Sequence, residues 1–155
     1  MKLSTRGRYA LRMMLDIATN GVEEKPVSIA AIAGRTDMSR GYLEQLALAL
    51  KNAGLVKAVS GRYGGYRLAR PSSEITLGRI IEAAIGPINL VDCVASPEDC
   101  MRSADCDCRL VYALINRRIT DVLDEYTLSD LATGAFKPLV QDSILPTIAG
   151  FSEGS

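Results

Sequence analysis

The side chains best suited to chemistry lie in one short segment. All cysteines of the chain fall within residues 93–108, and the chain contains neither histidine nor tryptophan. They are Cys93, Cys100, Cys106 and Cys108. Thiolates hold iron–sulfur clusters and zinc, and they also undergo thiol–disulfide exchange. We therefore expect a sensor segment here. We also expect it to form an irregular loop, because Pro97 and several small residues interrupt any helical or strand period.

The residues alone leave the kind of cysteine site open. The spacing C-x6-C-x5-C-x-C lacks the closely spaced cysteine pairs of structural zinc sites, which disfavours zinc. Carboxylates around the cysteines disfavour the thiolate that a thiol–disulfide switch needs. These are Asp92, Glu98, Asp99, Asp105 and Asp107. An iron–sulfur cluster, zinc, a thiol switch and cysteines with no regulatory role all stay compatible with the pattern.

The composition suits a small protein that binds a polyanion through one half. The chain has 155 residues and is 48% hydrophobic, enough for one domain and an appendage. Residues 1–75 contain 12 Lys and Arg against 6 Asp and Glu, whereas residues 76–155 contain 6 against 12. Scattered charges are the alternative, but a basic half joined to an acidic half favours a polyanion-binding module with a regulatory module. The amphipathic N-terminus lacks the apolar block of a secretory signal, so we expect a cytoplasmic protein.

The basic half has the spacing of a helix-turn-helix. The pattern predicts helices from about Ser4 to Asn20, from Ser28 to about Gly34, and from Ser39 to Asn52, each started by a serine. The last would be the recognition helix, with leucines facing inward. Its outward residues are Ser39, Arg40, Gly41, Tyr42, Glu44 and Gln45. Arg and Gln can pair with guanine and adenine edges, and Glu can accept from cytosine N4. The arginines of the first helix, Arg6, Arg8 and Arg12, would either reach a phosphate or form a solvated face.

A β-hairpin is expected directly after the recognition helix. Residues 55–70 hold strand-forming residues on both sides of a glycine-rich tip, 61–65. A hairpin in this place is a wing, with Arg62 and Tyr63 at its tip near the DNA backbone or minor groove. The glycines do not form a phosphate-binding loop, because the Gly-Lys-Ser/Thr ending is missing and no helix follows. We expect a mainly α fold with a small β-hairpin wing.

The acidic half combines the cysteine segment with a long amphipathic helix. A helix from Thr76 to about Ile85 should precede the cysteines, and a long helix at about 108–126 should follow them. Its apolar stripe has little of its own chain to pack on, so we expect a second copy to cover it. Thr127 and Asp130 form a candidate capping box. We thus divide the chain into a DNA-binding domain (1–75), a region (76–132) that holds the sensor loop (92–108) and the dimerisation helix (about 108–126), and a tail (133–155) that we expect to be poorly ordered from Pro138 onward.

Three motifs in this order carry a family resemblance. The stretches LSTRGRYAL, SRGYLEQL and GRYGGYRL, followed by spaced cysteines before a long helix, closely resemble the Rrf2 family, which includes the IscR, NsrR, RirA and CymR regulators. The resemblance covers about residues 1–132. It implies a bacterial winged-helix transcription factor that forms homodimers through crossing C-terminal helices. Many members carry an iron–sulfur cluster on a three-cysteine loop, which implies Cys93, Cys100 and Cys106 as ligands.

The chain departs from that pattern at three positions. Arg109 stands where the cluster-binding regulators have a histidine, and Arg8 stands where others have an acidic ligand in the first helix. In the wing, Ser60 replaces the usual basic residue. The fourth ligand is therefore open, with Cys108 as first candidate and Asp107 as second, because clusters prefer thiolates.

The sequence thus predicts a homodimeric regulator, not an enzyme, that binds a pseudo-palindromic DNA operator under the control of an iron–sulfur cluster of 2Fe–2S or 4Fe–4S type. The alternative is a cluster-free regulator controlled by thiol redox state, zinc, a metabolite or a partner protein. No catalytic nucleophile–base pair is recognisable.

Overall fold

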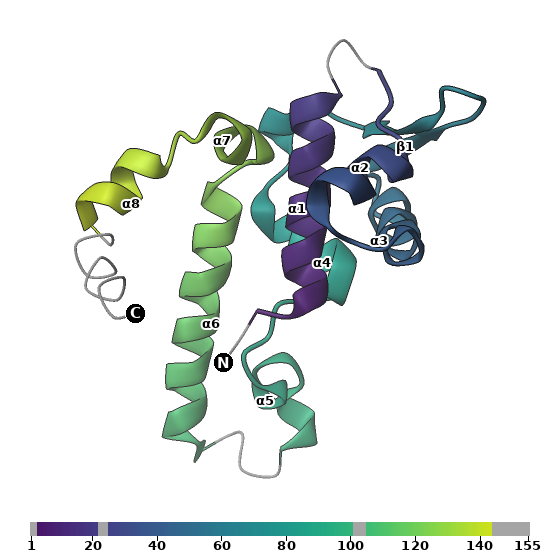
Figure 1. Ribbon diagram of the computed structural model, residues 1–155. Helices are drawn as coiled ribbons and strands as arrows, with labels where there is room; N and C mark the ends of the chain where they lie inside the picture. The colour runs from purple at the N-terminus through teal and green to yellow at the C-terminus, as the bar shows by residue number, and fades with distance from the viewer. Residues whose placement is uncertain (1–2, 22–24, 101–104, 144–155) are drawn as a thin grey trace, which may run out of the picture.

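The computed structural model describes residues 3–21, 25–100 and 105–143 (Figure 1). It is mainly helical, with one two-stranded antiparallel hairpin, as the sequence predicted. The helices are α1 (Thr5–Asn20), α2 (Ile29–Thr36), α3 (Arg40–Asn52), α4 (Leu77–Ile85), α5 (Asp92–Ala95), α6 (Asp107–Glu125), α7 (Leu128–Thr133) and α8 (Lys137–Ser143). The strands are β1 (Val56–Val59) and β2 (Gly65–Leu68), and two 3₁₀ helices are η2 (Ser72–Glu74) and η3 (Pro97–Asp99).

Helix α1 forms the centre of the core, with α2, α3, α4, α7 and the hairpin packed around it (Figure 1). Its buried side chains, Met13, Met14 and Ile17, follow helical spacing and meet apolar residues from each neighbour. Those partners include Ile32, Leu43, Leu46, Leu50, Ile75, Ile80 and Leu128. The inward leucines predicted for the recognition helix are thus confirmed.

Serine and threonine side chains start the main helices of this core. The hydroxyls of Ser4, Ser28 and Ser39 accept hydrogen bonds from the backbone of Gly7, Ala31 and Tyr42. Each bond satisfies a backbone donor that the first helical turn leaves unpaired. Thr127 and Asp130 form the predicted capping box at α7. These local signals explain why the helix starts could be read from the sequence.

The wing is held to the rest of the domain at its base. Strands β1 and β2 pair from Val56 with Leu68 to Val59 with Gly65. Tyr66 and Val27 exchange two backbone hydrogen bonds of 2.8 Å each, which attach β2 to the segment before α2. A Cβ at Gly65 would collide with the carbonyl of Val27, so glycine permits this close approach.

Helix α6 is attached to the core at its C-terminal end and otherwise runs away from it (Figure 1). Leu77 donates to the carbonyl of Tyr126 at 3.0 Å, and Leu128 donates to the carbonyl of Ile75 at 2.8 Å. A Cβ at Gly78 would collide with the Asp124 carboxylate, so α4 and α6 approach closely there. The described helices include none that is long and apolar enough to cross a membrane.

Two predictions of irregular structure were wrong in part. The cysteine segment contains α5 and η3, stabilised by short-range bonds such as the 2.9 Å bond from Ser96 N–H to the carbonyl of Asp92. These elements are too short to show a hydrophobic period. The tail forms α8 from Lys137, because Pro138 sits in the first helical turn, where its missing N–H has no intrahelical role. Residues 144–155 lie outside the described residues.

Candidate DNA-binding face and cysteine segment

The outward face of α3 carries the polar residues predicted to read DNA. Arg40, Glu44 and Gln45 are exposed, and Ser39 is exposed while it caps the helix. Tyr42 differs from them because it is half-buried and meets the ring of Tyr9 edge-on, with centroids 5.8 Å apart. The structure therefore gives Tyr42 a packing role that its place in the sequence does not reveal.

One apolar residue also lies on this outward face. Leu48 is 59% exposed, one turn beyond Glu44 and Gln45. Leu48 was not among the candidate residues predicted from the sequence, since a leucine in an amphipathic helix is usually a core residue. The signal that could have found it is its position, because Leu43, Leu46 and Leu50 already account for the buried face.

The wing tip presents an arginine and an aromatic ring to solvent. Tyr63 is 83% exposed, and the guanidinium carbon of Arg62 lies 5.7 Å from its ring centroid. A shallow hollow between the tip and α2 is lined in part by Arg35, Arg62 and Ser28. The tip thus places a cation at the end of a hairpin whose base is fixed. Contact with the DNA backbone or the minor groove requires such an arrangement.

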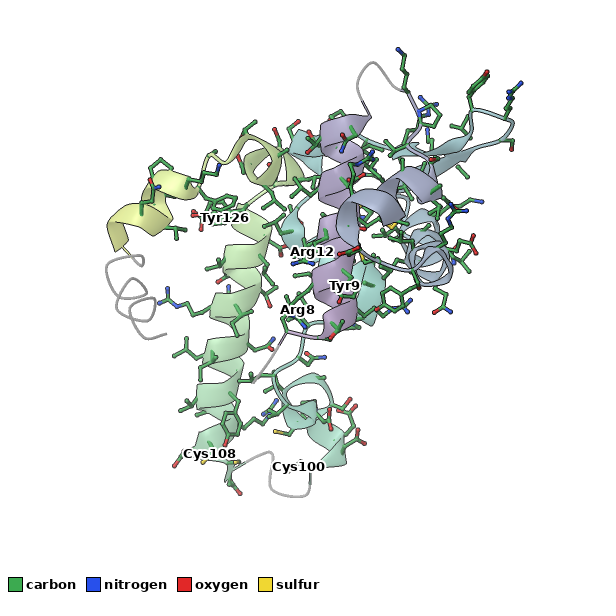
Figure 2. All side chains as sticks on the ribbon, in the orientation of Figure 1. Arg8, Tyr9, Arg12, Cys100, Cys108 and Tyr126 are labelled. Carbon is green, nitrogen blue, oxygen red and sulfur yellow. The ribbon has the colours of Figure 1, made fainter. Side chains whose placement is uncertain are left out.

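The three arginines of α1 have different surroundings. Arg6 donates from Nε to the carbonyl of Ala84 at 2.6 Å, which ties α1 to α4. Arg8 donates to the Thr5 hydroxyl at 3.2 Å. The guanidinium carbon of Arg12 lies 5.9 Å from the ring centroid of Tyr9 (Figure 2). Only Arg6 has a clearly structural contact with another helix.

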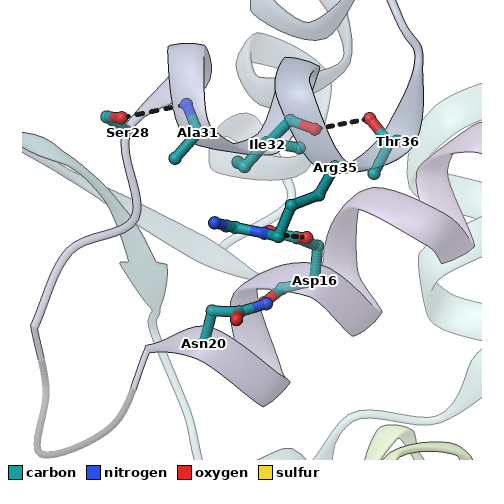
Figure 3. Close-up of polar contacts among 7 residues, drawn as sticks. All are labelled: Asp16, Asn20, Ser28, Ala31, Ile32, Arg35 and Thr36. Atoms are coloured by element: carbon teal, nitrogen blue, oxygen red, sulfur yellow. Dashed lines mark hydrogen bonds and ion pairs between the residues drawn. The ribbon is translucent and has the colours of Figure 1, made fainter.

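A bidentate ion pair holds α2 against α1. Arg35 donates to both carboxylate oxygens of Asp16, at 2.8 and 2.7 Å (Figure 3). Asp16 is buried, so the pair satisfies its charge inside the domain. The hydrogen bond to Asp16, and then its negative charge, raise the pKa of Arg35. This contact fixes the angle of the helix that precedes α3.

Two of the cysteines lie at the start of α6, and the other two lie in or beside the short helices α5 and η3. Cys93 is in α5, Cys100 follows η3, Cys106 is the N-cap of α6, and Cys108 is in its first turn. Cys100 and Cys108 lie at the same end of the molecule (Figure 2). Cys108 is exposed, and the other three are partly buried. Within the ranges that the structure describes, no three Cys, Asp or Glu side chains are grouped as a metal site would need.

The donor set nevertheless fits an iron–sulfur cluster by its chemistry, because it supplies three or four thiols from one segment. The segment is also bound to the long helix. Arg109 donates from Nε to the carbonyl of Cys93 at 3.0 Å, and Leu90 N–H donates to the Asn116 side chain at 2.8 Å. The position expected to hold a histidine ligand thus carries an arginine that fixes α5 to α6.

Helix α6 has a broad apolar face in contact with solvent. None of its described residues, 107–125, is buried, and Leu114 is 58% exposed. Other large exposed residues are Leu110, Val111, Tyr112, Ile115 and Val122. A shallow apolar hollow on the same helix is lined by Leu114, Ile115, Arg118, Ile119, Val122 and Leu123.

A helix-turn-helix with a fixed wing and an outward polar α3 defines a winged-helix DNA-binding transcription regulator. The family model of Rrf2, described as an iron-dependent transcriptional regulator, matches residues 3–134. The chain belongs to the Rrf2 family.

Its relatives include two kinds of regulator. CymR of Bacillus subtilis is 41% identical over 133 residues, which cover 86% of this chain and 91% of that protein. IscR of Vibrio parahaemolyticus is 38% identical over 133 residues, which cover 86% of this chain and 78% of IscR. These relatives are transcription regulators rather than enzymes.

Solved structures of the same two kinds are similar in fold. The structure of CymR, the global cysteine regulator of B. subtilis, matches with a TM-score of 0.70 at 41% identity over 86% of this chain and 97% of that one. IscR of T. potens matches with a TM-score of 0.70 at 36% identity over 87% and 88%. The chain is thus about equally similar to a CymR and to an IscR.

Proposed function

We propose that this regulator acts as a cytoplasmic homodimer on a pseudo-palindromic DNA operator, and that an iron–sulfur cluster on the cysteine segment controls its affinity for DNA. The observation that supports the proposed control is the placement of all four cysteines after α4 and no later than the first turn of α6, in a segment hydrogen-bonded to α6. A change in that segment would act directly on the helix that joins the subunits.

The exposed apolar face of α6 supports the proposed dimer. Contiguous apolar patches of this kind mark interaction surfaces. A two-fold dimer covers the same patch on both copies. Because α6 is bonded to the core beside α4, pairing of two α6 helices would fix the spacing of two α3 helices. Two recognition helices at a fixed spacing require a DNA site with two related halves.

The proposed contact set combines exposed residues of α3 and the wing with Tyr42, which is half-buried. Arg40 and Gln45 offer guanine and adenine contacts, and Glu44 can accept from cytosine. Ser39, Tyr42, Arg62 and Tyr63 complete the set, with the wing residues near the backbone or the minor groove.

Cys93, Cys100 and Cys106 would hold the cluster. Cys108 is the first candidate for the fourth ligand because it is a thiol in the first turn of α6, and Asp107 is the second. When bound, such a cluster supplies a redox-active and iron-dependent group. Arg109 would hold Cys93 beside α6, and Asn116 would hold the segment that precedes it.

The first experiment is an absorption spectrum with iron and acid-labile sulfide counts on protein purified without oxygen. We expect visible absorbance with matched iron and sulfide, lost in Cys93→Ala and retained in the control Ser96→Ala. Cys108→Ala decides the fourth ligand. Colourless wild-type protein would rule out the cluster. A Cys93→Ala variant that keeps its colour would rule out the ligand assignment.

The second experiment measures operator affinity for the cluster-loaded and cluster-free protein, on duplexes selected from a random-sequence library. We expect the affinities to differ, because the segment contacts α6. Equal affinity on several selected operators would remove the cluster from the control of DNA binding.

The similarity to CymR, the global cysteine regulator, favours a second candidate. In that case thiol redox state, zinc, a metabolite or a partner protein would control DNA binding without a cluster. Colourless protein that still binds its operator tightly, with an affinity that changes on oxidation or zinc removal, would support this candidate.

A further inference from the structure

The exposed face of α3 contains an apolar side chain that the fold does not need. The buried residues of α3, Leu43, Leu46, Ala47 and Leu50, define its inner side. At 3.6 residues per turn, Leu48 lies opposite them, between the directions of Glu44 and Gln45. Its exposure of 59% shows that no neighbouring element covers it. A single exposed leucine is common on protein surfaces, but this one stands on the surface proposed to enter the major groove.

Gly41 is a second residue on this face that packing does not explain. It lies seven residues, or about two turns, before Leu48. A Cβ built on Gly41 would meet nothing within 4 Å, and its backbone is helical. Glycine inside a helix is less stable than alanine there. Nothing within the described chain therefore requires a glycine at this position.

We propose that Leu48 contacts the C5-methyl group of a thymine in the major groove, and that the missing side chain of Gly41 lets α3 come close enough for this contact. The inference rests on the proposed function, because it needs α3 in the groove. Thymine is the only DNA base that presents a methyl group there, and apolar side chains are the groups that recognise it. Glycine is the usual residue where a backbone must approach a ligand closely.

The Leu48 contact can be tested by removing one methyl group from the DNA. Each thymine of a selected operator is replaced in turn by uracil, which keeps every hydrogen-bonding group and lacks only the methyl. We expect wild-type affinity to fall about fourfold at one position of each half-site, the effect of one methyl group removed from an apolar contact. Leu48→Ala should bind both duplexes equally. The control Leu139→Ala, at a leucine of α8 that is 56% exposed, should respond like the wild type.

The proposed role of Gly41 predicts that Gly41→Ala is more stable than the wild type but binds the operator more weakly. Gly41→Ala should raise the Tm by about 1–4 °C, because alanine is the better helix former. The same variant should bind the operator about tenfold more weakly, since the added methyl group would crowd a tight contact. Gly34→Ala in α2 is the matched control, because a Cβ there also meets nothing within 4 Å. It should raise the Tm similarly and leave operator affinity unchanged.

Uracil substitutions with no effect at any position, or with the same effect in Leu48→Ala, would overturn the thymine contact. Operator affinity in Gly41→Ala equal to that of wild type would overturn the close approach. In both cases the wild type would still prefer the selected duplex over a scrambled one. Equal affinity for selected and scrambled duplexes would instead mean that the proposed function itself has failed.

Discussion

The winged helix and α6 differ in what covers their apolar side chains. In the winged helix, residues such as Met13, Ile32 and Leu46 are fully enclosed by other parts of the same chain. In α6, Leu110 is 66% exposed and Leu114 is 58% exposed. Burying a large apolar side chain stabilises a fold by about 1.5–3 kcal/mol. The DNA-binding half obtains that stabilisation within one chain, whereas the described residues of the chain leave the apolar face of α6 without it.

This difference suggests a division of labour. The part that contacts DNA has a fixed shape in each subunit, held by helix caps, the Asp16–Arg35 pair and the Val27–Tyr66 bridge. Helix α6, which we propose joins the subunits, and the described elements of the cysteine segment before it, α5 and η3, contain no buried residue. In the proposed dimer, a signal that alters the cysteine segment would therefore change the relation between the two subunits without disturbing either recognition helix.

The largest expected effect comes from charge on the apolar face of α6. In the double variant Leu114→Asp and Val122→Asp, pairing of two helices would bury carboxylates without partners, so we expect a monomer. Operator affinity should fall by at least about 100-fold, because the second half-site is no longer bound by a linked subunit. Sedimentation velocity and operator binding measure the two effects.

The control for this double variant is Arg117→Gln on α6, whose side chain is 82% exposed in an i, i+4 pair with Asp121. It should stay dimeric. A double variant that remains a dimer would show that α6 is not the interface. A double variant that unfolds would show that α6 contributes to the core of one chain, contrary to its exposure.

Features set by neighbouring residues could be predicted from the sequence, whereas features set by contacts between distant segments could not. The winged helix follows from local signals, because Ser28 and Ser39 cap helices and the glycines of the wing mark a turn. Helices α5 and η3 could not be predicted, since elements of three or four residues have no period. The Arg6–Ala84 bond and the Tyr9–Tyr42 contact join distant parts of the chain, so only the tertiary structure reveals that they hold the domain together.

A smaller effect is expected from the wing, and it should leave the dimer intact. Arg62→Ala should weaken operator binding about tenfold, within the range for loss of one arginine contact to DNA. Sedimentation should show an unchanged dimer, because Arg62 is an exposed residue at the hairpin tip and not part of α6. Operator affinity of Arg62→Lys, measured at several salt concentrations, separates the effect of the positive charge from that of the guanidinium shape. If Arg62→Ala binds like the wild type, the wing does not contact the operator.

The ion pair between α1 and α2 should contribute about 1 kcal/mol to folding, because Arg35 is partly exposed and water screens the pair. Asp16→Ala should lower the free energy of unfolding by that amount at every protein concentration. Leu114→Ala should instead lower the free energy of unfolding only where dimers form. The difference from wild type should therefore grow with protein concentration. Urea unfolding at two concentrations checks both variants. If the difference in free energy of unfolding between wild type and Asp16→Ala changed with protein concentration, the assignment of this pair to the single chain would be contradicted.

The smallest expected effect lies at Asp130, beside the junction of α6 with the core. Hydrogen bonds from the Thr127 backbone and hydroxyl lower the pKa of Asp130 in the folded protein. A carboxyl with a lowered folded-state pKa stabilises the fold above its unfolded pKa, and this contribution disappears as the pH falls through the folded value. The stability difference between wild type and Asp130→Ala should therefore be constant near neutral pH and shrink below about pH 4. Asp130→Asn cannot titrate, so its stability difference from Asp130→Ala should not change with pH. A difference between wild type and Asp130→Ala that stays constant down to pH 2 would mean that the cap at α7 does not depend on the carboxylate charge.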